Sequence, residues 1–267
     1  MPPPPRWRCE VKAVSEHIEV SRDGAVQVIR MNRPDKKNAI TRAMYGAMAK
    51  ALVEGDADEA VRVHLILGVP GAFSSGNDLA DFMAVATGGE AGTEVHDFLK
   101  ALAQAEKPVL SGVDGIAVGI GTTINLHCDL TLATPRTRFH TPFVDLGLVP
   151  EAGSSLLGPA LIGRQRAFAL LGLGEPLGAD EAKAAGLIHD VVAEEELEAA
   201  ALALAQRVAQ KPPQALKIAR DFMLGDREAL VARIREEGEA FHARLKSDEA
   251  RAAFVAFMSR KSEKRSA

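Results

Sequence analysis

Short apolar runs alternate with glycine-rich turns and amphipathic segments through the first two thirds of the chain. The runs are rich in β-branched residues and short enough to be buried strands, and the strand pattern begins near His17. The predicted strands cover residues 26–29, 61–67, 109–113 and 129–133. The segments between them have apolar residues at helical spacing, which predicts helices over residues 41–53, 93–106 and 122–127. Strands that alternate with helices indicate an α/β architecture.

The pattern changes near residue 193, where alanine, leucine and glutamate at helical spacing replace the strand signal. Helices are predicted over residues 194–210, 214–224, 226–246 and 247–259, with Pro212-Pro213 ending the first. We therefore expect three parts. These are a proline-rich tail at 1–12, predicted to be disordered, an α/β core at 13–192, and a helical C-terminal region at 193–267.

Composition narrows the class of protein. The 267 residues are 47% hydrophobic and 25% charged, as in ordinary globular chains. A net charge of −4 disfavours a nucleic-acid partner. Two cysteines, Cys9 and Cys128, exclude a disulfide framework and a cysteine-rich zinc site. Neither an apolar run of ~20 residues nor a secretory signal is present, so we expect a cytoplasmic protein without a membrane partner.

Two glycine-rich turns each connect a predicted strand to a predicted helix, at residues 68–78 and 114–121. Free backbone N–H groups at such helix starts bind negative charge, either a phosphate or an oxyanion that develops during a reaction. The phosphate motifs do not fit, because GxxxxGK[ST] is absent and Ile124 stands where a GxGxxG motif needs its third glycine. A purely structural role for these glycines, in tight packing, stays open.

The same turns carry a family resemblance. Phe73-Ser-Ser-Gly-Asn-Asp-Leu79 closely resembles the first oxyanion-hole loop of the crotonase (enoyl-CoA hydratase/isomerase) superfamily, and Asp114-Gly-Ile-Ala-Val-Gly-Ile-Gly121 resembles the second. Arg33-Pro-Asp-Lys-Lys-Asn-Ala39 is similar to the loop on the CoA side. The resemblance implies a crotonase-like spiral of ββα units in the core and a helical trimerisation region at the C-terminus. It also implies an acyl-CoA thioester as ligand and a homotrimer or a hexamer formed by two trimers.

The resemblance assigns roles to residues of both turns. The N–H groups of Asn77 and Ile120 would hold the thioester oxyanion, and a main-chain role would leave both side chains free to vary. Lys36 would meet the phosphates of CoA by charge, although a solvated loop is an equal alternative. Further substrate-binding positions are predicted at Ser75, Gly76, Leu79, Gly119, Gly121 and Phe143.

The candidate general base is Glu151. The hydratases of the superfamily use two glutamates, whose positions hold Thr123 and Phe143 here. The segment 139–155 instead resembles the peroxisomal-type Δ3,Δ2-enoyl-CoA isomerases, whose single glutamate occupies the Pro-Glu-x-Gly position of Glu151. Glu151 is predicted at a helix start, where the structural alternative is a favourable partner for the helix dipole. Asp145 is the rival carboxylate.

Other candidates have simpler explanations. His127, Cys128 and Asp129 are consecutive, and core packing explains them better than catalysis. His140 is expected to be a packed histidine. The resemblance therefore implies conversion of a 3-enoyl-CoA to the trans-2-enoyl-CoA, with apolar neighbours raising the pKa of Glu151. No metal or redox cofactor is expected, and CoA itself is part of the substrate. The alternatives are hydration or another crotonase-type reaction, and a catalytically silent acyl-CoA-binding subunit.

Overall fold

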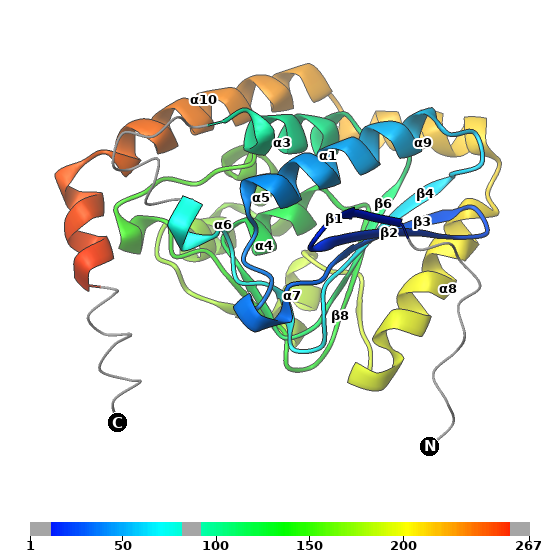
Figure 1. The fold of residues 1–267 in the computed structure, drawn as a ribbon, viewed down its shortest axis with the longest axis horizontal. Coiled ribbons are helices and arrows are strands. Elements are labelled where there is room, and N and C mark those ends of the chain that lie inside the picture. Colours follow the sequence, from blue (N-terminus) through cyan, green and yellow to red (C-terminus); the bar gives the residue numbers. More distant parts are fainter. Residues whose placement is uncertain (1–11, 82–91, 257–267) are drawn as a thin grey trace.

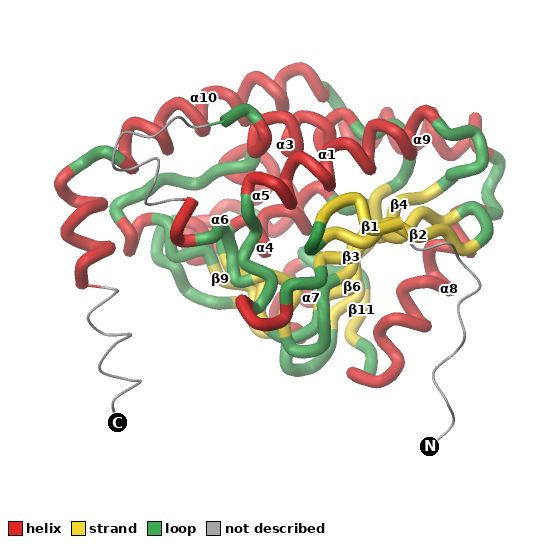
Figure 2. Tube along the Cα trace, in the orientation of Figure 1, coloured by secondary structure: helices red, strands yellow, loops and turns green. Residues whose placement is uncertain are grey.

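The computed structural model describes residues 12–81 and 92–256. The predicted mixed α/β architecture is confirmed, with helices on both sides of a central sheet (Figures 1 and 2). The predicted tail at 1–12 lies outside the described residues except for Lys12, and so does the basic end of the chain after residue 256. Within the described ranges no helix is both long and apolar enough to cross a membrane.

The larger sheet has seven strands in the order β1-β2-β3-β4-β6-β8-β11. Its strands are Lys12–Ser15 (β1), Ile18–Asp23 (β2), Val26–Met31 (β3), Val63–Leu67 (β4), Val109–Val113 (β6), Leu130–Ala133 (β8) and Asp190–Val191 (β11). The first three pair antiparallel, whereas β3, β4, β6, β8 and β11 run parallel. The sheet begins at Lys12, before the predicted start near His17.

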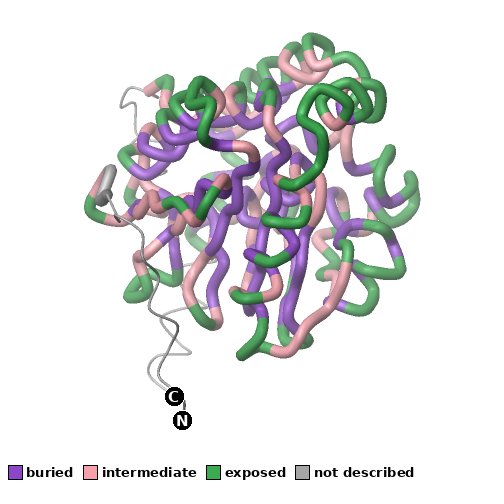
Figure 3. The backbone as a smooth tube through the Cα atoms, turned by 90° about the vertical axis from the view of Figure 1, so that its right-hand side faces the viewer, coloured by how far each residue is buried: buried purple, intermediate pink, exposed green. Residues whose placement is uncertain are grey.

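Each face of this sheet has its own apolar layer. Along β4, Val63, Leu65 and Leu67 point into a cluster with α8 (Leu197–Ala209), whereas Ile66 belongs to the main core on the other face. That core is covered by α1 (Arg42–Ala57) and α3 (Glu94–Gln104). Buried residues accordingly concentrate in the central strands (Figure 3). Burial on both faces explains why these strands read as continuous apolar runs.

A second sheet of four strands has the order β10-β9-β7-β5. Its strands are Ala72–Ser74 (β5), Ile116–Val118 (β7), Arg138–His140 (β9) and Leu177–Gly178 (β10). Strands β5 and β7 lie inside the two predicted glycine turns, so describing those segments only as turns was wrong. A strand of three residues is too short to show a recognisable alternation of apolar and polar side chains. Strands β5 and β7 are instead defined by their pairing with each other in the sheet. Each unit is therefore two strands followed by a helix.

Short helices connect these units. They are η1 (Pro34–Lys36), α4 (Ile120–Thr123), η2 (Ile124–His127), η3 (Val144–Leu146), α5 (Ser154–Ile162), α6 (Arg164–Leu171), α7 (Ala179–Ala185) and η4 (Glu194–Glu196). The Thr41 hydroxyl accepts a hydrogen bond from the Met44 N–H, which confirms the predicted cap of α1.

The described C-terminal part after residue 193 is helical. It contains α8, α9 (Pro213–Leu224), α10 (Arg227–Leu245) and further α-helical residues at 248–256. Helix α10 packs along α3, which in turn packs along α1, and the three lie side by side (Figure 1). This layer supplies the walls of the candidate site.

Candidate active site

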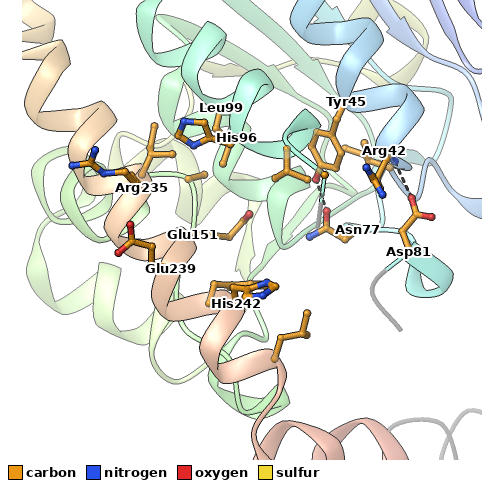
Figure 4. Close-up of a pocket in the computed structure, with 18 residues that line it drawn as sticks. Arg42, Tyr45, Asn77, Asp81, His96, Leu99, Glu151, Arg235, Glu239 and His242 are labelled. Atoms are coloured by element: carbon orange, nitrogen blue, oxygen red, sulfur yellow. Dashed lines mark hydrogen bonds between the residues drawn. The ribbon is translucent and has the colours of Figure 1, made fainter. Parts of the chain in front are cut away.

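A cavity of about 560 Å³ lies between α1, α3 and α10 (Figure 4). Its lining combines apolar side chains with several polar ones. It includes Ile40, Arg42, Tyr45, Asn77, Asp81, Val95, His96, Leu99, Glu151, Ile234, Arg235, Glu239, Phe241, His242 and Leu245. Two of the predicted site residues, Asn77 and Glu151, therefore face the same cavity. A cavity of this size with a few convergent polar groups is typical of a small-molecule site.

Glu151 reaches the cavity from a turn, and not from a helix start as predicted. Helix α5 begins only at Ser154, and Ala152 and Gly153 before it have left-handed backbones, with φ of +64° and +69°. At Gly153 an added Cβ would lie 2.5 Å from the Leu230 side chain of α10. The turn is therefore shaped by packing against α10, a contact that local sequence does not reveal.

The Glu151 carboxyl is held in a nearly dry position. Only 6% of the residue is exposed, and the Thr123 hydroxyl donates a hydrogen bond to Oε1 over 3.2 Å. The pKa of Glu151 is raised to about 7: burial is the largest cause, the Thr123 hydrogen bond opposes it, and the charge of the nearby Glu237 carboxylate adds a smaller upward contribution. The predicted upward direction of this pKa agrees with the structure. A carboxylate with a pKa near neutrality is suited to both accepting and returning a proton.

The two glycine turns lie next to each other at the ends of adjacent parallel strands. Ser74 of β5 pairs with Ala117 of β7, and the sites predicted for the oxyanion donors follow three residues after each. Gly76 has φ of +96°, and an added Cβ there would lie 3.1 Å from the Val118 carbonyl oxygen. Glycine is thus required for the close approach of the two turns.

The Asn77 N–H faces away from its neighbouring segment. The Gly76 carbonyl accepts from Ile40 and the Asp78 N–H donates to the Ile40 carbonyl, so in extended backbone the intervening N–H points to the opposite side. Among the described residues, none accepts a hydrogen bond from it. This N–H is therefore available to a ligand.

Ile120 begins α4 directly after Gly119, whose φ is +55°. The Gly119 carbonyl accepts from the N–H groups of Thr122 and Thr123, whereas no acceptor for the Ile120 N–H exists in the described part of the chain. First-turn N–H groups have no partner within the helix. Ile120 as a whole is fully buried, main chain included, and it does not line the cavity.

The Asn77 side chain, for which no role was expected, has a hydrogen-bond partner of its own. The Tyr45 hydroxyl of α1 donates a hydrogen bond to Asn77 Oδ1 (Figure 4). Tyr45 is almost fully buried, and burial together with the charges of Glu151 and Asp81 raises its pKa well above the ordinary value, which keeps the donor protonated. The Asn77 side chain thus anchors its turn to α1.

The remaining substrate-binding predictions surround this pair of turns but do not line the cavity. Lys36 is exposed, and its carbonyl accepts a hydrogen bond from the Ser75 hydroxyl over 3.1 Å. Leu79 packs against the main core. Phe143 lies 3.8 Å from a Cβ added at Gly119 and packs edge-on against Phe241 of α10. Gly121 is pressed against Ser74, where an added Cβ would come within 2.7 Å of the carbonyl oxygen.

The rival candidates lie elsewhere. Asp145 is exposed in η3 and does not line the cavity. His127 is buried with Nε2 2.7 Å from the Ala152 carbonyl oxygen, and burial lowers its pKa to about 4. Burial raises the pKa of Cys128 to about 12, which makes it a poor nucleophile. The contacts of His140 with Gly119 and Thr122 run through its backbone.

Sequence reasoning did not find Tyr45, the Thr123–Glu151 hydrogen bond or Glu237. Tyr45 and Glu237 sit on helix faces that also carry buried residues, Met48 beside Tyr45 and Ile234 beside Glu237. A polar residue on such a stripe is the signal that could have found them. Which site they serve depends on the packing of distant segments.

The arrangement can take a proton from a carbon acid and stabilise the anion that results. Glu151 is the buried carboxylate of the cavity, whereas Glu239 is exposed at its rim and Asp81 accepts a hydrogen bond from the Arg42 N–H. Two free main-chain N–H groups lie in adjacent turns. No cluster of three or more metal-ligating side chains occurs within residues 12–81 and 92–256.

Comparison with known proteins places this geometry in a family. Residues 21–266 match the enoyl-CoA hydratase/isomerase family. Enoyl-CoA delta isomerase 2 of Rattus norvegicus is 34% identical over 253 residues, which cover 92% of this chain. The chain spans only 64% of the length of that relative.

Solved structures with a similar fold support the same family assignment. The structure of Pseudomonas aeruginosa OdaA has a TM-score of 0.86 and 42% identity, covering 91% of this chain and 99% of that one. An enoyl-CoA hydratase/isomerase from Pseudoalteromonas atlantica T6c has a TM-score of 0.87 and 37% identity, covering 92% and 98%. The predicted crotonase-like fold is thereby confirmed, and the chain belongs to the enoyl-CoA hydratase/isomerase (crotonase) family.

Proposed function

We propose that the protein shifts the double bond of a 3-enoyl-CoA to give the trans-2-enoyl-CoA. The observation that carries this proposal is the one buried carboxylate among the described residues that line the cavity, Glu151, whose pKa burial raises to about 7. The likeness to enoyl-CoA delta isomerase 2 supports the same reaction.

In this mechanism the Glu151 carboxylate takes a proton from C2 of the thioester. The C2–H electron pair moves into a dienolate, whose oxygen accepts hydrogen bonds from the N–H groups of Asn77 and Ile120. Glu151 then returns the proton to C4, the C3=C4 bond is lost and C2=C3 forms. One carboxylate can serve both carbons in turn, and each main-chain donor of such a site is typically worth ~3–4 kcal/mol.

Hydration is disfavoured by the residues at the two positions where the hydratases carry glutamates. Thr123 donates its hydroxyl hydrogen bond to Glu151, and Phe143 presents an apolar ring. Neither can act as a general base toward water. We further propose that Lys36, exposed beside the Ser75 turn, meets a phosphate of CoA.

The test is Glu151→Gln, assayed with 3-hexenoyl-CoA and, in parallel, for hydration of crotonyl-CoA. We expect isomerisation by the wild type and a loss of at least about 1,000-fold in the variant. Turnover of the variant close to that of the wild type would remove Glu151 from the mechanism. Acyl-CoA binding without any turnover would instead identify a silent binding subunit.

We also propose assembly as a homotrimer or a dimer of trimers. Helix α9 supports this, because Phe222 and Met223 are 84% and 77% exposed in the single chain, next to the exposed Ile218. Light scattering of the wild type and of Phe222→Asp tests it, and a monomeric wild type would refute it.

A further inference from the structure

Glu237 is a charged residue on the buried face of α10. Only 7% of it is exposed, and it lies one helical turn from the buried Ile234. A carboxylate in such a position is costly unless hydrogen bonds and charges compensate for lost water. Its partners therefore indicate what it does.

Within the described residues, the side-chain hydrogen bonds of Glu237 all go to the segment that follows Glu151. Its carboxylate accepts from the Gly153 N–H over 2.6 Å, from the Ser155 N–H over 3.0 Å and from the Ser155 hydroxyl. Gly153 is the N-cap of α5 and has no side chain to accept these bonds. Glu237 thus caps α5 from a helix more than 80 residues away in the sequence.

The turn between Glu151 and α5 is held from two sides. On one side Glu237 binds Gly153, whose backbone packs against Leu230 of the same helix. On the other side His127, kept neutral by its lowered pKa, donates from Nε2 to the Ala152 carbonyl. Ala152 is a non-glycine residue in the left-handed region, a conformation that persists only where its surroundings enforce it.

We propose that Glu237 is a positioning residue for Glu151: from α10 it fixes the turn that aims the Glu151 carboxyl into the cavity, and in its ionised form it places a negative charge beside that carboxyl. This inference rests on the proposed role of Glu151 as the base. The proposed role of Glu237 connects α10, which forms one wall of the cavity, to the carboxyl group of Glu151.

The charges around Glu151 support the second half of the proposal. Glu237 on α10 and Tyr45 on α1 interact with it by charge, His127 of η2 contacts the neighbouring Ala152 carbonyl, and Arg233 donates a hydrogen bond to Ser155. The rim of the cavity adds charged or titratable groups, namely Arg42, Asp81, His96, Arg235, Glu239 and His242. Of these groups, Glu237 is the one whose charge raises the pKa of Glu151. Burial raises the pKa of Glu237 itself, while its hydrogen bonds to Ser155 and Gly153 and the charge of Arg233 favour its ionised form.

The experiment compares Glu237→Gln with Glu228→Gln, an exposed glutamate on the same helix and outside the cavity. We measure kcat and KM for 3-hexenoyl-CoA across pH. We also titrate the Glu151 carboxyl by ¹³C NMR in Glu-labelled protein, with its signal identified by its loss in Glu151→Gln.

For Glu237→Gln we expect the Glu151 titration and the acid limb of kcat/KM to move down by about half a pH unit. Misalignment should lower kcat about tenfold or more, with KM within about twofold. Glu228→Gln should match the wild type. A Glu237→Gln variant with unchanged titration midpoint and kcat would overturn the proposal.

A third variant, Ser155→Ala, keeps the charge and removes one hydrogen bond. If Glu237→Gln does not fold, lowered kcat at constant KM in Ser155→Ala supports the positioning role, and unchanged kcat overturns it. A wild type without isomerase activity would refute the proposed function, whereas the NMR titration would still test whether Glu237 sets the pKa of Glu151.

Discussion

Replacing Glu151 with glutamine should make the protein more stable at high pH. Burial raises the pKa of Glu151 from the ordinary 4.5 to about 7, so the folded protein binds its proton more tightly than the unfolded chain does. The stability of the wild type therefore falls as pH rises from about 4.5 to about 7. Above that range, at ~1.4 kcal/mol per pH unit, the ionised carboxylate costs about 3 kcal/mol.

Glu151→Gln removes this cost, because an amide of similar shape stays neutral and can still accept the Thr123 hydrogen bond. At pH 8 the variant should gain up to about 3 kcal/mol, or roughly 5–10 °C in Tm for a domain of this size. At pH 4.5 the two proteins should differ little, since both then carry a neutral side chain.

The assay is thermal unfolding followed by circular dichroism at pH 4.5, 6 and 8, with Glu228→Gln as the control for loss of an exposed glutamate. The control should track the wild type at every pH. If the Tm difference between Glu151→Gln and the wild type did not grow with pH, the carboxyl would not be desolvated in the folded state. A catalytic role for a base with an elevated pKa would then lose its physical basis.

Four further outcomes follow from the same geometry. For the wild type, kcat/KM should rise with pH to a plateau with a midpoint near 7, because the base acts ionised; a flat profile between pH 5 and 9 would contradict this. Thr123→Val removes the hydrogen bond that lowers the pKa of Glu151, so the midpoint should move to higher pH in the same assay. Tyr45→Phe releases the Asn77 side chain and should lower kcat severalfold, and stopped-flow turnover equal to that of the wild type would refute this anchoring role. Gly119→Ala places a Cβ at φ of +55° and ψ of −120°, a sparsely populated backbone conformation, which should cost ~1–3 kcal/mol in chemical denaturation and lower kcat more than it raises KM.

Periodicity along the chain determined the α/β class, the approximate bounds of the strands and helices that it predicted, and the positions of both glycine turns. These features are local, because strand and helix patterns, the Thr41 cap and the glycine spacing depend on neighbours a few residues apart. The strands β5 and β7 escaped detection because three residues carry too little pattern, and pairing between distant segments creates them.

Glu151 could be singled out from the sequence, by resemblance and by the threonine and phenylalanine at the two hydratase positions. Its burial, its pKa near 7 and its place on a turn could not be predicted, since they depend on segments distant in the sequence, among them Thr123 and helix α10. The Tyr45–Asn77 bond and the Glu237 cap likewise join segments more than 30 and 80 residues apart. Local sequence therefore determined which groups are present, and tertiary packing decided which lose their water and meet, because desolvation and hydrogen-bond geometry exist only once distant helices close over the sheet.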